Sequence, residues 1–161
     1  MATTTPTLIS ANEATQHASG VAGIQAVMNA LASLGLTDKV TFATLNVFGR
    51  NLSGIAKVTA RTGRDHFGNH SVAVLIGKNI TAGVVGGVMP LQTGHGASDI
   101  DSATGAGKAG GDIPAAQSHI AMARTLGVAL GIPSAALNTD FSASAGGKVV
   151  PAAVSSTVAG L

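Results

Sequence analysis

The 161-residue sequence has no cysteine, tryptophan or tyrosine, and its only aromatic side chains are four phenylalanines. The absence of cysteine excludes disulfide bonds, thiolate metal sites and cysteine nucleophiles. Only 10% of the residues are charged, against about 25% in a typical globular protein. Because 45% are hydrophobic, the composition is not that of a disordered chain. We expect a folded core built from Val, Ile, Leu, Met and Ala.

The chain has little net charge, because nine Lys and Arg stand against seven Asp and Glu. The basic residues are scattered and no aromatic residues lie among them to stack on bases, so nucleic-acid binding is not expected. No apolar run reaches the length of about 18 residues that a membrane span needs, and the first residues lack the pattern of a signal peptide. So few charges predict a chain that hides surface against a partner or forms part of something larger.

Apolar spacing and turn residues predict the main elements of the chain. Apolar residues three and four apart predict a helix over residues 10–34, which Gly35 would end. Residues 40–48 are β-rich with apolar alternation and predict a strand. The continuous apolar run 71–77 predicts a central strand, covered on both faces. Residues 80–88 predict a further short strand that its glycines weaken.

The second half of the chain contains long stretches of small residues. Residues 92–111 are almost all Gly, Ala, Ser, Thr and Asp and predict an exposed, mobile loop. A second helix is expected over 112–130, with Pro114 in its first turn and Gly131 at its stop. The order of elements predicts an α/β fold with a small sheet of about three strands flanked by two helices. The expected organisation is a flexible segment 1–9, one α/β domain 10–137 and a small-residue tail 138–161, disordered or docked on a partner.

The densest polar cluster lies at 63–70, just ahead of the predicted central strand. Asp65 and His66 are adjacent, and His70 follows four residues later, which could bring a second imidazole round one turn. Carboxylate and imidazole suit a divalent cation such as Zn²⁺ or Mn²⁺. The alternative is that Asp65 caps a turn while the imidazoles bind backbone groups.

The other histidines are less informative. His95 lies between two glycines near Asp99 and Asp101, where it is either a solvated loop residue or completes a metal site. His17 and His119 fall in the predicted helices, where a structural role is expected. The sequence has no Gly-x-Ser-x-Gly motif, so no nucleophile is assigned.

Several ordered segments together resemble one known pattern. The chain, over roughly residues 10–137, is similar to the C-terminal part of an uncharacterised, sulfatase-related bacterial family in the alkaline phosphatase-like superfamily, often exported by a twin-arginine signal. The segments that carry the resemblance are Leu34-Gly-Leu-Thr-Asp-Lys-Val-Thr-Phe42, Asn46-Val-Phe-Gly-Arg50, Gly63-Arg-Asp-His-Phe-Gly-Asn-His-Ser71 and Leu130-Gly-Ile-Pro133.

The resemblance implies a divalent metal (Zn, Mn or Ca) bound by Asp65 and His66, with His70 or His95 assisting. It also implies metal-dependent hydrolysis of phosphate or sulfate esters in the periplasm or outside the cell. Members of the superfamily carry the nucleophile in an N-terminal half that has no counterpart here. The chain is therefore expected to be inactive alone.

Two functions follow from these observations. The first is a fragment or relative of a metal-dependent phosphate or sulfate ester hydrolase that keeps part of the metal site and works with a missing N-terminal half. The second is a non-catalytic structural or self-assembling protein, a homo-oligomer that buries its sheet face between subunits. Metal uptake and oligomeric state distinguish the two.

Overall fold

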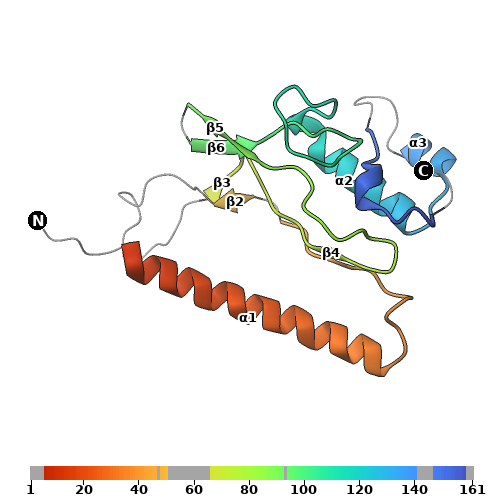
Figure 1. Cartoon of the computed structure of the whole chain (residues 1–161), viewed down its shortest axis with the longest axis horizontal. Helices are drawn as coiled ribbons and strands as arrows, with labels where there is room; N and C mark the ends of the chain where they lie inside the picture. Colours follow the sequence, from red (N-terminus) through yellow and green to blue (C-terminus); the bar gives the residue numbers. More distant parts are fainter. Residues whose placement is uncertain (1–5, 47, 51–65, 93, 141–146, 159–161) are drawn as a thin grey trace, which may run out of the picture.

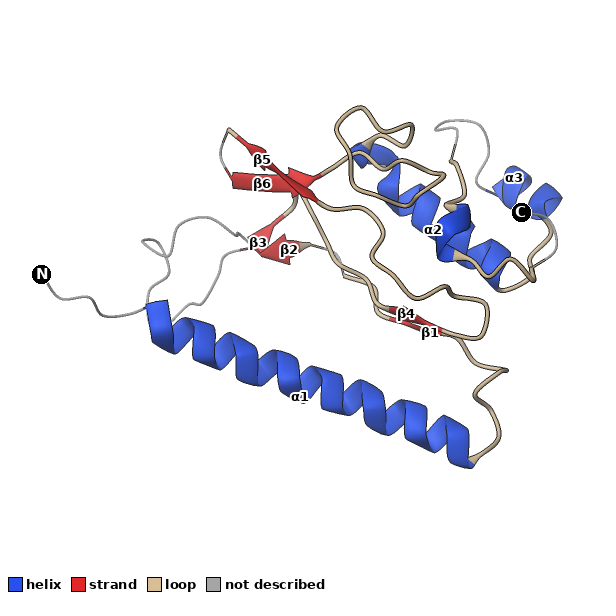
Figure 2. Ribbon diagram, viewed as in Figure 1, coloured by secondary structure: helices blue, strands red, loops and turns tan. Residues whose placement is uncertain are grey.

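The computed structural model describes residues 6–46, 48–50, 66–92, 94–140 and 147–158. These residues form a mixed arrangement of α-helices and short antiparallel strand pairs (Figures 1 and 2). The elements are α1 (Pro6–Ser33), β1 (Phe42–Ala43), β2 (Gly49–Arg50), β3 (His66–Phe67), β4 (Leu75–Ile76), β5 (Val88–Leu91), β6 (Gly94–Ala97), the 3-10 turn η2 (Ala115–Gln117), α2 (Ser118–Ala129), α3 (Ser134–Asp140) and the 3-10 turn η3 (Pro151–Ala153).

Helix α1 confirms the first predicted helix but is not packed into a core. It lies apart from the other helices, along one side of the molecule (Figure 1). No side chain between residues 12 and 33 is buried. Val21 and Val27 are 66% and 45% exposed, and Ile24, Met28 and Leu31 are half-buried. The apolar side of α1 therefore lacks the cover that a helix of a globular domain normally has.

The two long helices end as the sequence predicts. Gly35 follows α1 with φ of +66°, and Gly131 follows α2 with φ of +77°. At both ends, the N–H of the glycine and that of the next residue donate to carbonyls of the last helical turn at 2.8–3.0 Å. This is the Schellman motif, which requires the left-handed conformation that glycine adopts without strain.

The single sheet of about three strands is not seen among the described residues, which form three separate antiparallel pairs: β1 with β4, β2 with β3 and β5 with β6. Within the predicted strand 40–48 only Phe42 and Ala43 are in a described strand, β1, and β2 begins just after it at Gly49 and pairs with a different partner. The prediction of a covered central strand at 71–77 is wrong in this structure. Only β1 pairs with β4 in the part described, and Val72 and Val74 are 64% and 38% exposed.

The core lies around α2, which fills most of the second predicted helix. Five residues of α2 are buried, and Ile113, just before it, is only 2% exposed. The buried apolar side chains form two clusters, one of Ile100, Ile113, Ala121 and Val150, the other of Val128, Ala129, Leu137 and Val154. Helix α2 contributes to both clusters and so holds this region together.

Residues 147–158, within the predicted tail, are docked on the chain's own helix α2. Val150 and Val154 are 2% and 4% exposed. The Thr125 hydroxyl of α2 accepts a hydrogen bond from the Val150 N–H at 3.0 Å and donates to the Ala121 carbonyl at 2.6 Å. This threonine therefore joins the C-terminal segment to the helix.

The prediction of an exposed, mobile loop over 92–111 is wrong for residues 94–100, whereas residues 106–110 are exposed and lie outside helices and strands. Residues 94–97 form β6, and Ile100 is 7% exposed in the core. Ile100 and Ile113 exchange two backbone hydrogen bonds of 2.8 and 3.0 Å, so they close the loop between them like a short hairpin. The sequence hides this order because the residues that carry it are small and polar.

Among the described residues, no helix combines the length and the apolar character that crossing a membrane requires.

Candidate functional site

The predicted metal-binding residues divide between two places in the structure. Asp65 lies outside the described residues. His66 is exposed in β3, opposite Arg50 of β2. Its ring stacks on Phe48, with centroids 3.9 Å apart and planes inclined by 25°. The ribbon formed by β2 and β3, together with Phe48 just before β2, therefore positions His66.

His70 is buried behind the same ribbon, with 8% of its surface exposed. Its Nδ1 lies 3.2 Å from the carbonyl oxygen of His95. Because a carbonyl only accepts, Nδ1 is the donor of this contact, which in the neutral ring leaves the lone pair on Nε2. A histidine that binds a metal is commonly oriented by this kind of hydrogen bond. A Cβ at Gly49 would lie 2.5 Å from the His70 ring, so the close approach of ribbon and ring requires glycine.

His95 meets His70 through its main chain. The segment around it is fixed by the β5–β6 pairing and by a 2.7 Å hydrogen bond from the Ala97 N–H to the Asn69 carbonyl. The His95 Nδ1 is buried and has no hydrogen-bond partner in the described structure. The structure thus places the His70 ring against the main chain of His95. The ring nitrogens left to act as metal ligands are His70 Nε2 and His95 Nδ1. Within the described ranges, no group of three or more His, Asp or Glu could hold a metal ion.

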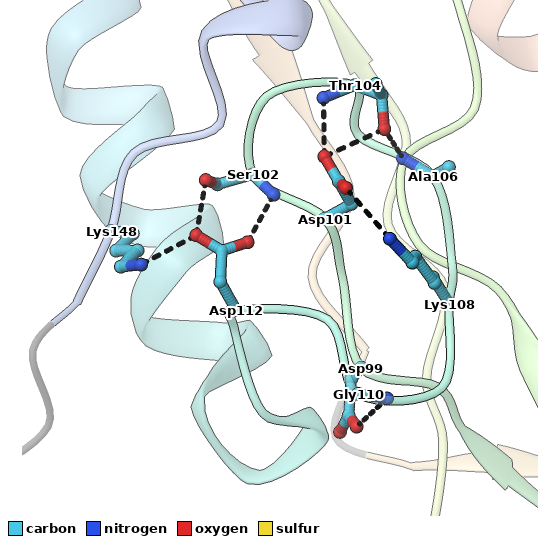
Figure 3. A network of polar contacts seen from close by, with 9 residues as sticks. All are labelled: Asp99, Asp101, Ser102, Thr104, Ala106, Lys108, Gly110, Asp112 and Lys148. Atoms are coloured by element: carbon cyan, nitrogen blue, oxygen red, sulfur yellow. Dashed lines mark hydrogen bonds and ion pairs between the residues drawn. The ribbon is translucent and has the colours of Figure 1, made fainter.

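The acidic residues near His95 are occupied by their own loop (Figure 3). Asp99 accepts backbone N–H bonds from Gly110 at 3.0 Å and Ala115 at 2.9 Å. Asp112 accepts from the Ser102 N–H and hydroxyl, both at 2.7 Å, and pairs with Lys148 at 2.6 Å. These carboxylates shape the loop, so we do not assign them to a metal site with His95.

The same contacts stabilise the charged forms of two carboxylates. The Lys148 ammonium, followed by the Ser102 hydroxyl and N–H, holds the pKa of Asp112 well below its usual range. The Thr104 N–H and hydroxyl, with Lys108 nearby, lower the pKa of Asp101. Hydrogen bonds to a carboxylate favour its ionised form. These contacts in the folded loop therefore favour the ionised forms of both Asp101 and Asp112.

A second polar pair, missed by the sequence analysis, lies at a groove. The Ser71 Oγ is 3.0 Å from the His119 Nε2. Ser71 precedes β4, and His119 is in the first turn of α2. Both line a groove of about 970 Å³ between residues 71–77, residues 80–88 and α2.

Sequence reasoning missed this pair because its members are 48 positions apart and have no shared motif. Neither residue lies in a local motif that would mark it as functional. Ser71 stands at the start of an apolar run, and His119 is the second residue of α2. Only the packing of residues 71–77 beside α2 brings the two side chains together. A search with family models, curated proteins and solved structures finds no match to this chain.

Proposed function

We propose that this protein is a self-assembling structural protein that covers α1 with a second copy of the chain. The observation that carries this proposal is the state of α1, a helix of 28 residues with no buried side chain between residues 12 and 33. In proteins, helices owe most of their stability to packing of an apolar side. Packing of α1 against a second copy of the chain would supply the burial that this long, exposed helix lacks.

The apolar residues of α1 have the spacing of a helix-pairing seam. Val21, Ile24, Met28 and Leu31 follow one another at intervals of three, four and three residues, which is the spacing of the apolar positions in coiled coils. Glu13 is the only Asp, Glu, Lys or Arg between residues 12 and 33, so little charge opposes the approach of a second α1. Val72 and Val74 on the 71–77 segment are exposed apolar residues as well.

Sedimentation velocity tests the proposal. We expect the wild type to sediment as a dimer or a larger oligomer, and the double variant Ile24→Glu and Met28→Glu to sediment as a monomer. The matched control, Ser19→Glu and Ala26→Glu, places the same charges on the opposite side of α1 and should still assemble. A wild type that stays monomeric at concentrations where its fold is intact would overturn the proposal.

The second candidate is a relative of metal-dependent phosphate or sulfate ester hydrolases, as the resemblance to the alkaline phosphatase-like superfamily implies. The observation that favours it is the orientation of His70, whose Nδ1 faces the His95 carbonyl, together with the unpartnered Nδ1 of His95. Imidazole nitrogen is a ligand that Zn²⁺ accepts. Under this proposal Asp65 and His66 supply the remaining ligands, and a separate N-terminal half supplies the nucleophile.

This candidate also gives the separate strand pairs a role, since they would join one α/β sheet when the other half is present, in the periplasm or outside the cell. Calorimetry with Zn²⁺, Mn²⁺ or Ca²⁺ tests it. The wild type should take up metal, and the double variant Asp65→Ala and His66→Ala should not. No metal uptake by the wild type would exclude the metal site while leaving self-assembly through α1 intact.

A further inference from the structure

The groove beside α2 combines an apolar interior with one reactive pair. The lining includes Val72, Leu75, Ile80, Met122 and Val150. Its volume of about 970 Å³ lies at the upper end of the range of about 300–1,000 Å³ typical of small-molecule sites. Such sites usually hold a ligand by an apolar surface and orient it by a few convergent polar groups. Here the side chains of two lining residues, Ser71 and His119, hydrogen-bond to each other.

The Ser71–His119 distance is within the range found between a serine nucleophile and its base. A serine becomes a useful nucleophile when a base lies within about 2.6–3.2 Å of its hydroxyl, and here the distance is 3.0 Å. The two residues sit on different elements, Ser71 before β4 and His119 on α2, so the separation is set by the fold. Ser71 is half-buried and His119 exposed, which leaves room for an ester to approach.

We propose that this groove is an esterase site for carboxylic esters with an apolar acyl group. The Ser71 Oγ attacks the ester carbonyl carbon while its proton passes to the His119 Nε2. The C–O bond to the alcohol breaks, and the alcohol leaves with that proton. Water then attacks the acyl-serine, giving its proton to His119, and the carboxylic acid is released as the proton returns to the Ser71 Oγ.

The acyl chain is the part of the substrate that the groove selects. Val72 adjoins Ser71 in the sequence, and Met122 lies one helical turn from His119; both line the groove. An apolar chain placed there gains free energy with each methylene removed from water. We therefore expect butyrate esters to react faster than acetate esters. None of the described lining residues comes from α1, so this inference does not depend on self-assembly.

Hydrolysis of p-nitrophenyl butyrate by the full chain provides the first test. Ser71→Ala and His119→Gln should each lower kcat/KM about 100-fold, the scale of positioned proton transfer. Exposed imidazoles hydrolyse activated esters slowly, so His17→Gln is the matched control for His119→Gln. Ser19→Ala, an exposed serine outside the groove, is the control for Ser71→Ala, and both controls should keep wild-type rates. Equal rates in wild type and Ser71→Ala would overturn the proposal.

Covalent labelling of the wild type gives a second test, which does not depend on the folding of any variant. A fluorophosphonate should modify the protein at one site, and peptide mass spectrometry should place the adduct on Ser71. Prior incubation with p-nitrophenyl butyrate should slow the labelling. Labelling spread over several serines, or no labelling at all, would contradict a nucleophile at Ser71.

Discussion

The helices α1 and α2 are both rich in small apolar residues and both end at a left-handed glycine, yet their surroundings differ. Helix α2 has five buried residues and takes part in both core clusters. Helix α1 has no buried residue between 12 and 33. The difference comes from their neighbours among the described residues: residues 98–113 and 147–158 pack on α2, whereas no described segment buries a side chain of α1 between residues 12 and 33. In the described structure one region is packed within the chain, and the other keeps its apolar residues exposed or half-buried.

The largest expected effect is the loss of core volume beside α2. Ile113→Ala removes a side chain that is 2% exposed, and such changes cost about 2–5 kcal/mol of the free energy of unfolding. Val21→Ala on α1, where the side chain is 66% exposed, should change it by less than about 0.5 kcal/mol. Urea unfolding of dilute protein followed by circular dichroism measures both. Similar losses for the two variants would remove the contrast between the regions.

The next effect concerns the hydrogen bond that joins α2 to the C-terminal segment. Thr125→Val leaves the buried Val150 N–H without its partner, a loss of about 1–3 kcal/mol. Thr139→Val on α3 is the matched control, because its hydroxyl also donates to the carbonyl four residues back but is exposed. The control should stay close to wild type in urea. If Thr125→Val also unfolds at the wild-type midpoint, residues 147–158 do not stabilise α2.

Glycine substitutions should have opposite signs in the two helices. A Cβ at Gly20 or Gly23 meets nothing within 4 Å, so alanine should stabilise α1 by about 1 kcal/mol per site. A Cβ at Gly127 would lie 2.6 Å from a Leu137 methyl group, so alanine there should destabilise α2. Far-UV circular dichroism and urea midpoints report the two outcomes. A loss of helix content in the α1 variants would mean that α1 packs closely in the isolated chain.

The smallest effect is the pH dependence of the loop over residues 99–112. The pKa of Asp112 is held below its unfolded value of 3.8 by Lys148 first and by Ser102. The stabilisation is therefore complete above about pH 4 and is lost as the pH falls through the folded-state pKa. Urea midpoints should fall between about pH 4 and about pH 2. Asp112→Asn and Lys148→Met should both flatten this dependence, and an unchanged slope in both would exclude the pair as its source.

The parts of the fold that could be predicted are those that local chemistry determines. The 3.6-residue spacing of apolar side chains predicted both long helices. Gly35 and Gly131, which follow the last apolar residues of these patterns, predicted where the helices end. The order within residues 92–111 was not predicted because it depends on carboxylates that bind distant amides. Asp99, for example, accepts from Gly110 and Ala115, and such pairings leave no periodic pattern.

The sites were harder to predict for the same reason. The sequence pointed to His70 and His95, and the structure joins them through a backbone carbonyl, which no spacing rule reveals. Ser71 and His119 meet because two elements far apart in the sequence pack side by side. The strand partners were likewise set by contacts between distant segments, and this is why one expected sheet became three pairs in the described structure.

Hydrogen exchange over a dilution series tests most directly the claim that α1 is covered by a second copy while α2 is stable within one chain. The account predicts that the amides of α1 lose protection as the protein is diluted, while those of α2 keep the same protection at every concentration. Loss of α1 protection in step with the dissociation seen by sedimentation would support it. Protection of α1 that is as strong as that of α2 and independent of concentration would contradict it.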